Sequence, residues 1–331
     1  MKVSVKSFLF GINGEQDGRQ DALAFNIDKG IYAIADGVSN SFHPEIVSKL
    51  LCEMFLSMDI EDSNHLVEYI ETNIIPEIKQ RWEELVTAKF QTLSGRLLRH
   101  ELYNYETFHC GASTFCGIII DQSKHTIKYA ILGDSTLFIK TKENNTIELN
   151  STIYNDNSTE NAPIIYSNTT DAVLSNGTIV GHWLSGEFPI ENVLSVSLMT
   201  DGMAKWFQQN LQQEADPEST IWDLQSDEDF YKFATNGRFI GELDDDLAII
   251  IIRPDISNEN NLNVIGATTK PSADEENKQT LGSYTNNAIT AVNCSHATKR
   301  KIFNIFFKYR MIKLLRLMKF RHLKINRQRK A

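Results

Sequence analysis

The sequence is poor in cysteine and has no long apolar run. Its 331 residues include 4 cysteines, and their spacing fits neither a disulfide framework nor a zinc site. No apolar stretch approaches the roughly 18 residues that a membrane-spanning helix needs. The apolar run near the N-terminus ends at Gly11 and is too short for a signal peptide. We therefore expect a protein that works in a reducing, cytoplasmic setting.

Acidic residues are missing from the end of the chain. Residues 299–331 hold 13 of the 33 basic residues and no acid, whereas residues 1–298 hold the other 20 basic residues and all 43 acidic ones. This asymmetry predicts an acidic body with a basic interaction tail. Nucleic acid is an unfavourable partner, because its phosphates would repel the acidic body.

Large apolar residues are scarce in the stretch before that tail. Residues 255–298 are rich in Asn, Thr, Ser and Ala and predict a disordered linker, because they cannot offset the entropy cost of ordering. Residues 299–331 predict a basic amphipathic helix. Such a helix can bind an anionic membrane surface, dock in a partner's groove or fold back on the acidic domain. The first alternative would place the protein at the inner membrane surface. The apolar stripe of this helix consists of Phe307, Met311, Leu314, Leu315 and Met318.

Residues 1–254 alternate strand-like and helix-like segments and predict one α+β domain. The strand-like segments are short, rich in Ile and Val, and bounded by Gly, Asp or Asn. The span between the first two has helical spacing and begins near Pro44. Residues 203–241 are acidic and predict a flap or a small helical insertion. The predicted strands are 31–35, 113–120, 126–132, 193–200 and 247–253, and the helical spans are 43–58 and 65–90.

Acidic side chains stand at the ends of four of these strands. Asp36, Asp134 and Asp201 each follow an apolar segment, and the run 244–246 precedes the last one. If the strands lie side by side, the carboxylates converge, and they cannot all stay ionised without cations. Oxygen ligands alone favour Mg²⁺ or Mn²⁺. An Asp-Gly pair after a strand is also an ordinary turn, so spacing alone supports a turn and a metal ligand about equally.

Six short segments of the chain occur in the order typical of one enzyme family. They are "GRQDALAF", "YAIADGVSNSF", "GASTFCGIIID", "YAILGDSTLF", "SLMTDGMAKWF" and "DDDLAIIII". Together they resemble the metal-dependent Ser/Thr protein phosphatases of type 2C, the PPM family, particularly its bacterial members. The resemblance covers residues 1 to about 253. It implies a four-layer α-β-β-α sandwich, in which two antiparallel sheets are flanked by helices.

The resemblance also implies a metal centre at one end of the sandwich. Two Mn²⁺ or Mg²⁺ ions would be bridged by Asp36, and the Gly37 carbonyl would bind one of them. Asp201 and Asp245 would complete the shell of the second ion. Asp134 would hold a third, weaker ion together with Asp201.

Two further assignments follow from the same resemblance. Asp21 would sit in the outer shell and orient a metal-bound water, so Asp21 and Asp36 are the predicted catalytic residues. The three consecutive aspartates leave the register uncertain by one residue. We choose Asp245 as the ligand because Asp246 then falls where the family usually has Asn.

The sequence departs from the family pattern at three places. Gln16 stands where members commonly have a phosphate-binding Arg, and Arg19 is the nearest substitute, with an exposed loop side chain as the equally supported alternative. Ser39 and Asn40 replace the usual Gly pair after Asp-Gly. Val38 replaces a His that some members use as general acid. His43 could serve instead, although a solvated histidine at a helix start is the better interpretation.

These observations predict a metal-dependent protein Ser/Thr phosphatase. It would hydrolyse phosphoserine and phosphothreonine by attack of water activated at a dinuclear centre, and it would be paired with a cognate Ser/Thr kinase. Cys110 is not a candidate nucleophile, because the Cys-x5-Arg loop of cysteine phosphatases is missing. Two alternatives remain: a phosphatase-like binding or scaffold module with little or no turnover, and a hydrolase of small phosphoesters with the same centre.

Overall fold

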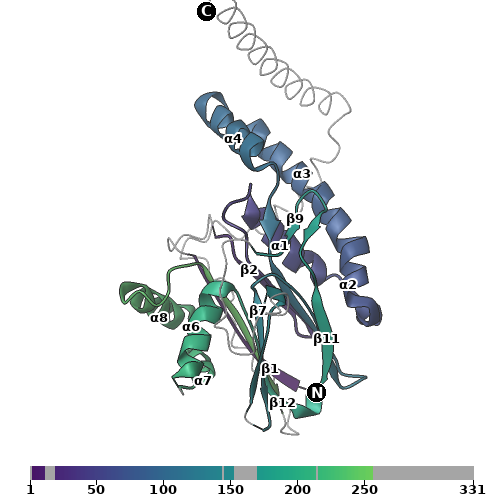
Figure 1. The fold of residues 1–331 in the computed structure, drawn as a ribbon, viewed down its shortest axis with the longest axis vertical. Helices are drawn as coiled ribbons and strands as arrows, with labels where there is room; N and C mark the ends of the chain where they lie inside the picture. The colour runs from purple at the N-terminus through teal and green to yellow at the C-terminus, as the bar shows by residue number, and fades with distance from the viewer. Residues whose placement is uncertain (1, 12–18, 144, 153–169, 214, 256–331) are drawn as a thin grey trace, which may run out of the picture. The chain divides into compact units, whose positions relative to one another are not determined.

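The computed structural model describes residues 2–11, 19–143, 145–152, 170–213 and 215–255 (Figure 1). All of them belong to one compact unit of the chain. Apart from Asp255, the predicted linker at 255–298 and the predicted basic helix at 299–331 lie outside the described residues. The substitution at Gln16 lies outside them as well.

Two five-stranded antiparallel sheets form the centre of the fold (Figure 1). A third, small sheet of three strands was not predicted. The first sheet has the order β1 (Lys2–Phe10), β13 (Leu247–Asp255), β12 (Val193–Met199), β7 (Thr136–Thr141) and β8 (Thr146–Leu149). The second has the order β11 (Leu184–Pro189), β6 (Thr126–Leu132), β5 (Phe115–Asp121), β3 (Ile31–Ala35) and β2 (Ala22–Asn26). The small sheet has the order β10 (Ile179–Val180), β9 (Ala172–Leu174) and β4 (Ala112–Ser113).

Helices cover the outer faces of the two large sheets. The second sheet packs against α1 (Pro44–Phe55), η1 (Ile60–His65), α2 (Leu66–Tyr69), a π-helical turn η2 (Ile70–Ile74) and α3 (Ile75–Thr92), and α4 (Gly95–Phe108) follows α3. The first sheet packs against α6 (Asp201–Gln212), α7 (Pro217–Trp222) and α8 (Asp227–Phe239). A short turn, η3 (Ile190–Asn192), precedes β12. The predicted α+β class and α-β-β-α sandwich are confirmed.

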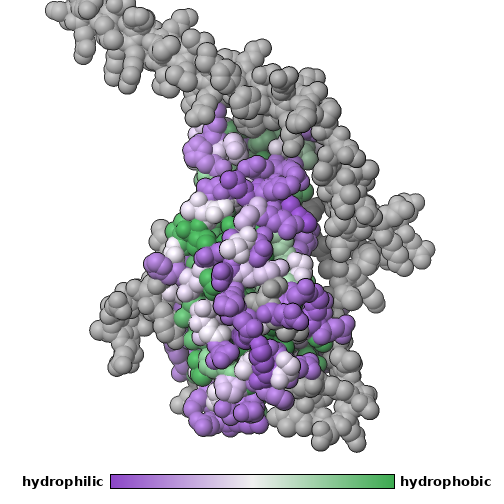
Figure 2. Space-filling view, turned by 90° about the vertical axis from the view of Figure 1, so that its right-hand side faces the viewer, coloured by the Kyte–Doolittle hydropathy of each residue, from purple (hydrophilic) through white to green (hydrophobic). Residues whose placement is uncertain are grey.

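The side-chain alternation along each strand explains this layering. In β13, Ala248 and Ile250 face the other sheet, while Ile249 and Ile251 face the helices. Successive residues of a strand point to opposite faces, so a strand that is apolar at every position is buried on both sides. The unbroken apolar runs in the sequence therefore come from the two middle layers. Figure 2 shows that hydrophilic residues dominate one outer face of the molecule.

The predicted elements agree with the structure except in detail. The predicted strands at 31–35 and 126–132 match β3 and β6, and the acidic segment 203–241 is helical. The strand predicted at 113–120 is two strands, β4 and β5, because the Thr114 N–H donates to the Asp36 carbonyl at the break. The helical span predicted at 65–90 contains the π turn. Pro76 lacks the N–H that would bond the carbonyl of Thr72, which accounts for that irregularity.

Candidate active site

Asp21 and Asp36 are neighbours because the β2–β3 hairpin pairs the residues beside them. Ala22 lies opposite Ala35 in the antiparallel register, so the two carboxylates leave the second sheet at the same end. Their side chains share a hydrogen bond. Asp21 is buried and Asp36 is half-buried. The hairpin thus places the two predicted catalytic residues next to each other.

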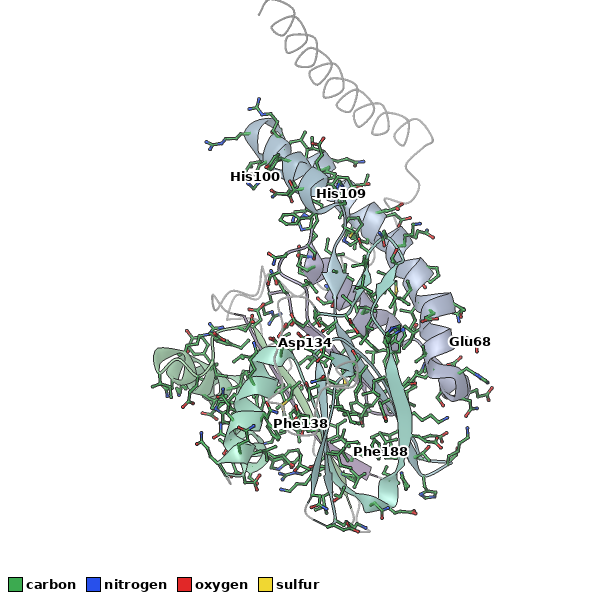
Figure 3. All side chains as sticks on the ribbon, viewed as in Figure 1. Glu68, His100, His109, Asp134, Phe138 and Phe188 are labelled. Carbon is green, nitrogen blue, oxygen red and sulfur yellow. The ribbon has the colours of Figure 1, made fainter. Side chains whose placement is uncertain are left out.

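The register of the first sheet brings the other predicted ligands together. Met199 of β12 lies opposite Thr136 of β7 on one side and Ile249 of β13 on the other. Asp134 therefore precedes β7 where Asp201 follows β12, and Asp245 lies just before β13 at the same edge. Figure 3 shows Asp134 near the ends of the strands, away from His100 of α4 and from His109, which follows that helix.

Hydrogen bonds between the two sheets hold these two groups of acids against each other. The Thr200 hydroxyl donates to Asp21 Oδ2 at 2.7 Å, and the Gln20 N–H donates to Asp246 Oδ2 at 2.8 Å. The hydroxyls of Thr114 and Ser135 lie 2.6 Å apart. These bonds connect chain segments more than 20 residues apart, and sequence reasoning found none of them. We call Asp21, Asp36, Asp134, Asp201, Asp245 and Asp246 the acid cluster.

Burial and mutual repulsion disfavour ionisation within the acid cluster. Burial raises the pKa of Asp21 well above its usual range, and burial together with the charges of Asp21 and Asp201 does the same for Asp36. Burial and the nearby Asp201 raise the pKa of Asp134 to about 7 and raise that of Asp245. A group of carboxylates that repel one another in this way favours a bound cation.

The donor set of the acid cluster fits a hard divalent ion. All donors are oxygen atoms, which suits Mg²⁺ and Mn²⁺. Asp134 is only 6% exposed, and its buried Oδ1 has no hydrogen-bond partner. Among the described residues, however, no three His, Cys, Asp or Glu side chains are already arranged around one point as a metal site. The oxygen donors of the acid cluster therefore suit such ions, but the side chains would have to move closer together to bind one.

Two glycines at the site are required by close packing. A Cβ at Gly37 would lie 2.8 Å from the Pro44 Cβ and 2.9 Å from the Gln20 carbonyl oxygen. A Cβ at Gly202 would lie 2.6 Å from the Asp246 carbonyl oxygen. Such distances leave no room for a side chain, so both Asp-Gly pairs are fixed by packing rather than by turn conformation. The predicted metal contact of the Gly37 carbonyl stays a prediction.

The three consecutive aspartates before β13 have different environments. Asp244 is exposed, whereas Asp246 is buried and engaged by the Gln20 N–H. Asp245 is half-buried, and its pKa is raised by burial and by the charge of Asp201. The Asp245 carbonyl also accepts a hydrogen bond from Arg238 Nη2 at 2.7 Å. Asp245 is thus the member that faces Asp201, and its choice as the ligand remains a prediction.

Arg19 and His43 are the remaining site candidates. Arg19 is half-buried and directly precedes Gln20, whose N–H bonds Asp246, and its role as a phosphate ligand stays a prediction. His43 begins α1 but is not solvated. Its Nδ1 lies 2.7 Å from Glu45 Oε1, and its Nε2 lies 2.7 Å from Glu101 Oε1. Both ring nitrogens are engaged, so His43 is a poor candidate for a general acid.

Cys110 has the environment of a structural thiol. It is half-buried, and burial raises the pKa of the thiol. A nucleophilic cysteine needs the opposite shift, because the thiolate is the reactive form. The exclusion of Cys110 as a nucleophile is therefore supported by the fold.

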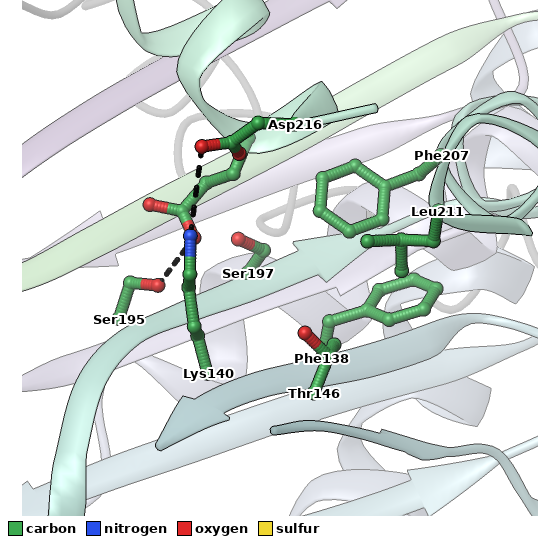
Figure 4. A pocket seen from close by; sticks show the side chains of 9 residues that line it. Phe138, Lys140, Thr146, Ser195, Ser197, Phe207, Leu211 and Asp216 are labelled. Carbon is green, nitrogen blue, oxygen red and sulfur yellow. Dashed lines mark hydrogen bonds and ion pairs between the residues drawn. The ribbon is translucent and has the colours of Figure 1, made fainter. Parts of the chain in front are cut away.

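A small pocket lies elsewhere, on the outer face of the first sheet (Figure 4). It has a volume of about 20 Å³, enough for about one water molecule. Lys140 Nζ pairs with Asp216 Oδ2 at 3.7 Å across it. Ser195, Ser197, Phe207 and Glu218 also line it. None of the predicted site residues contributes to this pocket, and its size excludes a phosphopeptide.

No helix in the described part of the chain is both long and apolar enough to cross a membrane. The membrane-binding segment predicted from the sequence is the tail, which lies outside the described residues.

Comparisons with solved structures agree with the fold. The structure is similar to that of the Ser/Thr phosphatase Stp1 from Staphylococcus aureus, with 13% sequence identity and a TM-score of 0.50 over 77% of this chain and 98% of that one. It is also similar to PppA, a regulatory component of T6SS in Pseudomonas aeruginosa, with 14% identity and a TM-score of 0.50 over 76% of this chain and 98% of that one. Identities this low show the fold alone. A search of curated proteins gives no match.

The family assignment comes from the sequence itself. The family model described as Protein phosphatase 2C matches residues 13–234, about two thirds of the chain. This range contains Asp21, Asp36, Asp134 and Asp201. The chain therefore belongs to the protein phosphatase 2C family, whose members are Ser/Thr phosphatases and thus hydrolases.

Proposed function

We propose that the chain is a metal-dependent phosphatase that removes phosphate from phosphoserine and phosphothreonine in proteins. One observation carries this proposal: aspartates from both sheets meet at one edge, where burial together with the charges of neighbouring aspartates raises the pKa values of Asp21, Asp36, Asp134 and Asp245. Buried carboxylates that repel one another destabilise a fold, so their presence together favours a function that needs a cation.

Five residues would hold the ions. Asp36 and the Gly37 carbonyl, Asp201 and Asp245 would bind two ions, and Asp134 with Asp201 would provide a weaker third position. The family generally depends on Mn²⁺ or Mg²⁺. When bound, such ions activate water as a nucleophile and neutralise the charge that develops on a phosphoryl group.

The chain's own residues would position the reactants. The Thr200 hydroxyl donates to Asp21 and fixes its carboxyl against Asp36, where it can accept a proton from an attacking water. Ala248 N–H donates to the same hydroxyl at 3.0 Å, so Thr200 is itself held by β13. Arg19 would bind the substrate phosphate in place of the usual family arginine.

The experiment is phosphate release from a phosphothreonine peptide by the full chain in Mn²⁺. We expect turnover that EDTA removes and that Asp36→Asn lowers by at least about 100-fold, because Asp36 lies at the centre of the acid cluster. Asp28→Asn is the matched control, since Asp28 is an exposed aspartate of the β2–β3 turn. Equal activity of Asp36→Asn and Asp28→Asn would contradict the proposal.

Two other functions are outcomes of the same experiment. Metal binding without phosphate release would favour a phosphatase-like binding or scaffold module, for which the Gln16 substitution is the supporting observation. Faster hydrolysis of small phosphoesters than of the phosphopeptide would favour a small-molecule hydrolase. A panel of both substrates with the same enzyme preparation distinguishes all three.

The partners follow from this function. The substrate would be a phosphoprotein, and a Ser/Thr kinase would supply it. For the basic tail we propose binding to an anionic membrane surface from the cytoplasmic side, supported by its 13 basic residues and apolar stripe. Sedimentation with anionic vesicles should remove the full chain from solution and leave a chain ending at residue 254. Equal pelleting of both would contradict the membrane proposal.

A further inference from the structure

Lys205 places a positive charge inside the acid cluster. It lies one turn after Asp201 on α6, and its Nζ is 2.7 Å from Asp201 Oδ2. The Lys205 side chain is 34% exposed and that of Asp201 only 13% exposed, so the pair is partly shielded from water. The sequence suggested no role for this lysine.

The ammonium group of Lys205 acts on more than one acid. Its charge stabilises the ionised forms of Asp134 and Asp245, both proposed metal ligands. Lys205 also experiences the charges of Asp244 and Asp245 in addition to its pairing with Asp201. The lysine therefore contacts Asp201 directly and is close enough to Asp134 and Asp245 for its charge to act on both.

A second lysine with the same spacing shows what is unusual about Lys205. Lys232 on α8 pairs with Glu228 at 2.8 Å, also four residues apart, but the two side chains are 62% and 76% exposed. That pair is an ordinary surface contact, and the coupling of such pairs is weak. Lys205 forms the same kind of i, i+4 pair, but next to the carboxylates of the acid cluster.

We infer that the Lys205 ammonium occupies the place of the third, weaker ion beside Asp134 and Asp201, so that the centre binds two divalent ions. This inference rests on the proposed function and deepens it. The lysine is tethered and needs no binding from solution, and it repels any divalent ion close to it. The Lys205 ammonium then neutralises the negative charge of Asp201 in place of a third ion.

The test is a count of the Mn²⁺ ions bound by the full chain, made by calorimetry and by the electron paramagnetic resonance signal of free Mn²⁺. We expect two ions for the wild type, and three for Lys205→Met and for Lys205→Gln. Lys205→Arg and Lys232→Met should bind two ions, because the first keeps the charge in place and the second removes a lysine remote from the cluster.

Three results would overturn the inference. Two ions on Lys205→Met, with the wild-type affinities, would show that the lysine displaces nothing. Three ions on the wild type would show that the third position is open. No Mn²⁺ on any variant would contradict the metal centre itself, which separates failure of the proposed function from failure of this inference. Thermal unfolding of each variant confirms that the counts refer to folded protein.

Discussion

Glu218 on the helix-covered face of the first sheet and the acid cluster at the edge of that sheet are both buried, but they have opposite chemistry. On the helix-covered face, Glu218 is 5% exposed. Its Oε1 accepts hydrogen bonds from Nε and Nη2 of Arg253 at 2.8 and 2.6 Å, and its Oε2 accepts one from the Ser195 hydroxyl at 2.5 Å. Arg253 in turn lies 4.1 Å over the Trp222 ring. Every charge in this group has a partner supplied by the chain.

The acid cluster at the sheet edge lacks that balance. Asp21 is paired with another acid, and Asp134 Oδ1 is buried with no hydrogen-bond partner. Asp201 of this cluster has a cation in direct contact, the Lys205 ammonium at 2.7 Å. The contrast teaches that burial of an acid does not reveal its role, whereas the absence of a matching donor does. The environment of Glu218 is that of a stabilising residue, whereas the environment of the acid cluster supports the proposed cation site.

Removal of Glu218 should have the largest effect on stability. Glu218→Ala leaves the Arg253 guanidinium and the Ser195 hydroxyl without their partner, so we expect a loss of about 3 kcal/mol in the free energy of unfolding. Urea denaturation monitored by fluorescence measures it. Glu228→Ala, which breaks an exposed pair, should cost less than about 0.5 kcal/mol. Equal losses in the free energy of unfolding would contradict the expected difference between the buried and the exposed ion pair.

Mn²⁺ should stabilise the protein through the acid cluster alone. At one hundred times its dissociation constant, an ion that binds only the folded state adds about 2.7 kcal/mol. Glu218→Ala should gain as much stability from Mn²⁺ as the wild type, since Glu218 pairs with Ser195 and Arg253 and not with any member of the acid cluster. Asp36→Asn should gain little. Thermal melts with and without Mn²⁺ give the comparison, and a full gain by Asp36→Asn would be the contrary result.

Without divalent ions, Asp36→Asn should be more stable than the wild type. The substitution removes a carboxyl group that burial, Asp21 and Asp201 all disfavour in its ionised form. We expect a gain of about 1 to 2 kcal/mol at neutral pH in EDTA, together with the loss of phosphatase activity. Urea denaturation in EDTA measures it, with Asp28→Asn as the neutral control. A decrease in stability would show that the acids are satisfied in the metal-free protein.

Glu148 offers the smallest and most pH-dependent effect. Burial raises its pKa to about 7, and one of its oxygens lacks a hydrogen-bond partner. A carboxyl group with a raised pKa contributes stability below its unfolded pKa of about 4.5 and loses that contribution as the pH rises through 7. Glu148→Gln should therefore exceed the wild type by on the order of 1 kcal/mol at pH 8, and the difference should shrink towards pH 5. A difference independent of pH would rule out this explanation.

The layers of the fold could be predicted from the sequence because they depend on local patterns. The apolar runs of β3 and β13 are buried on both faces, and the family order of the acidic motifs gave the sandwich. The sequence could also place Asp36 and Asp201 at strand ends, because each stands directly after an apolar run. These predictions needed only the residues next to each other in the chain.

The contacts that assemble the site could not be predicted in this way. Thr200 and Asp21 are 179 residues apart, and Gln20 and Asp246 are 226 apart. Their contact depends on how two sheets pack, and residue type alone does not specify that. Lys205 was missed for another reason. An i, i+4 pair of Asp and Lys on a helix is an ordinary surface pattern, and only the neighbouring strands turn it into part of a site.

The hydrogen bond from Thr200 to Asp21 also has a consequence for how the chain acquires its activity. Synthesis supplies Asp21, Asp36 and Asp134 early, but Thr200 and Asp201 belong to the end of β12 and the start of α6, and β13 comes later still. Contacts between such distant segments require the closure of long loops, which costs entropy before the contact is made. An unfinished chain thus exposes acids without a place for an ion. Binding of a metal ion would therefore indicate that the two sheets have packed against each other.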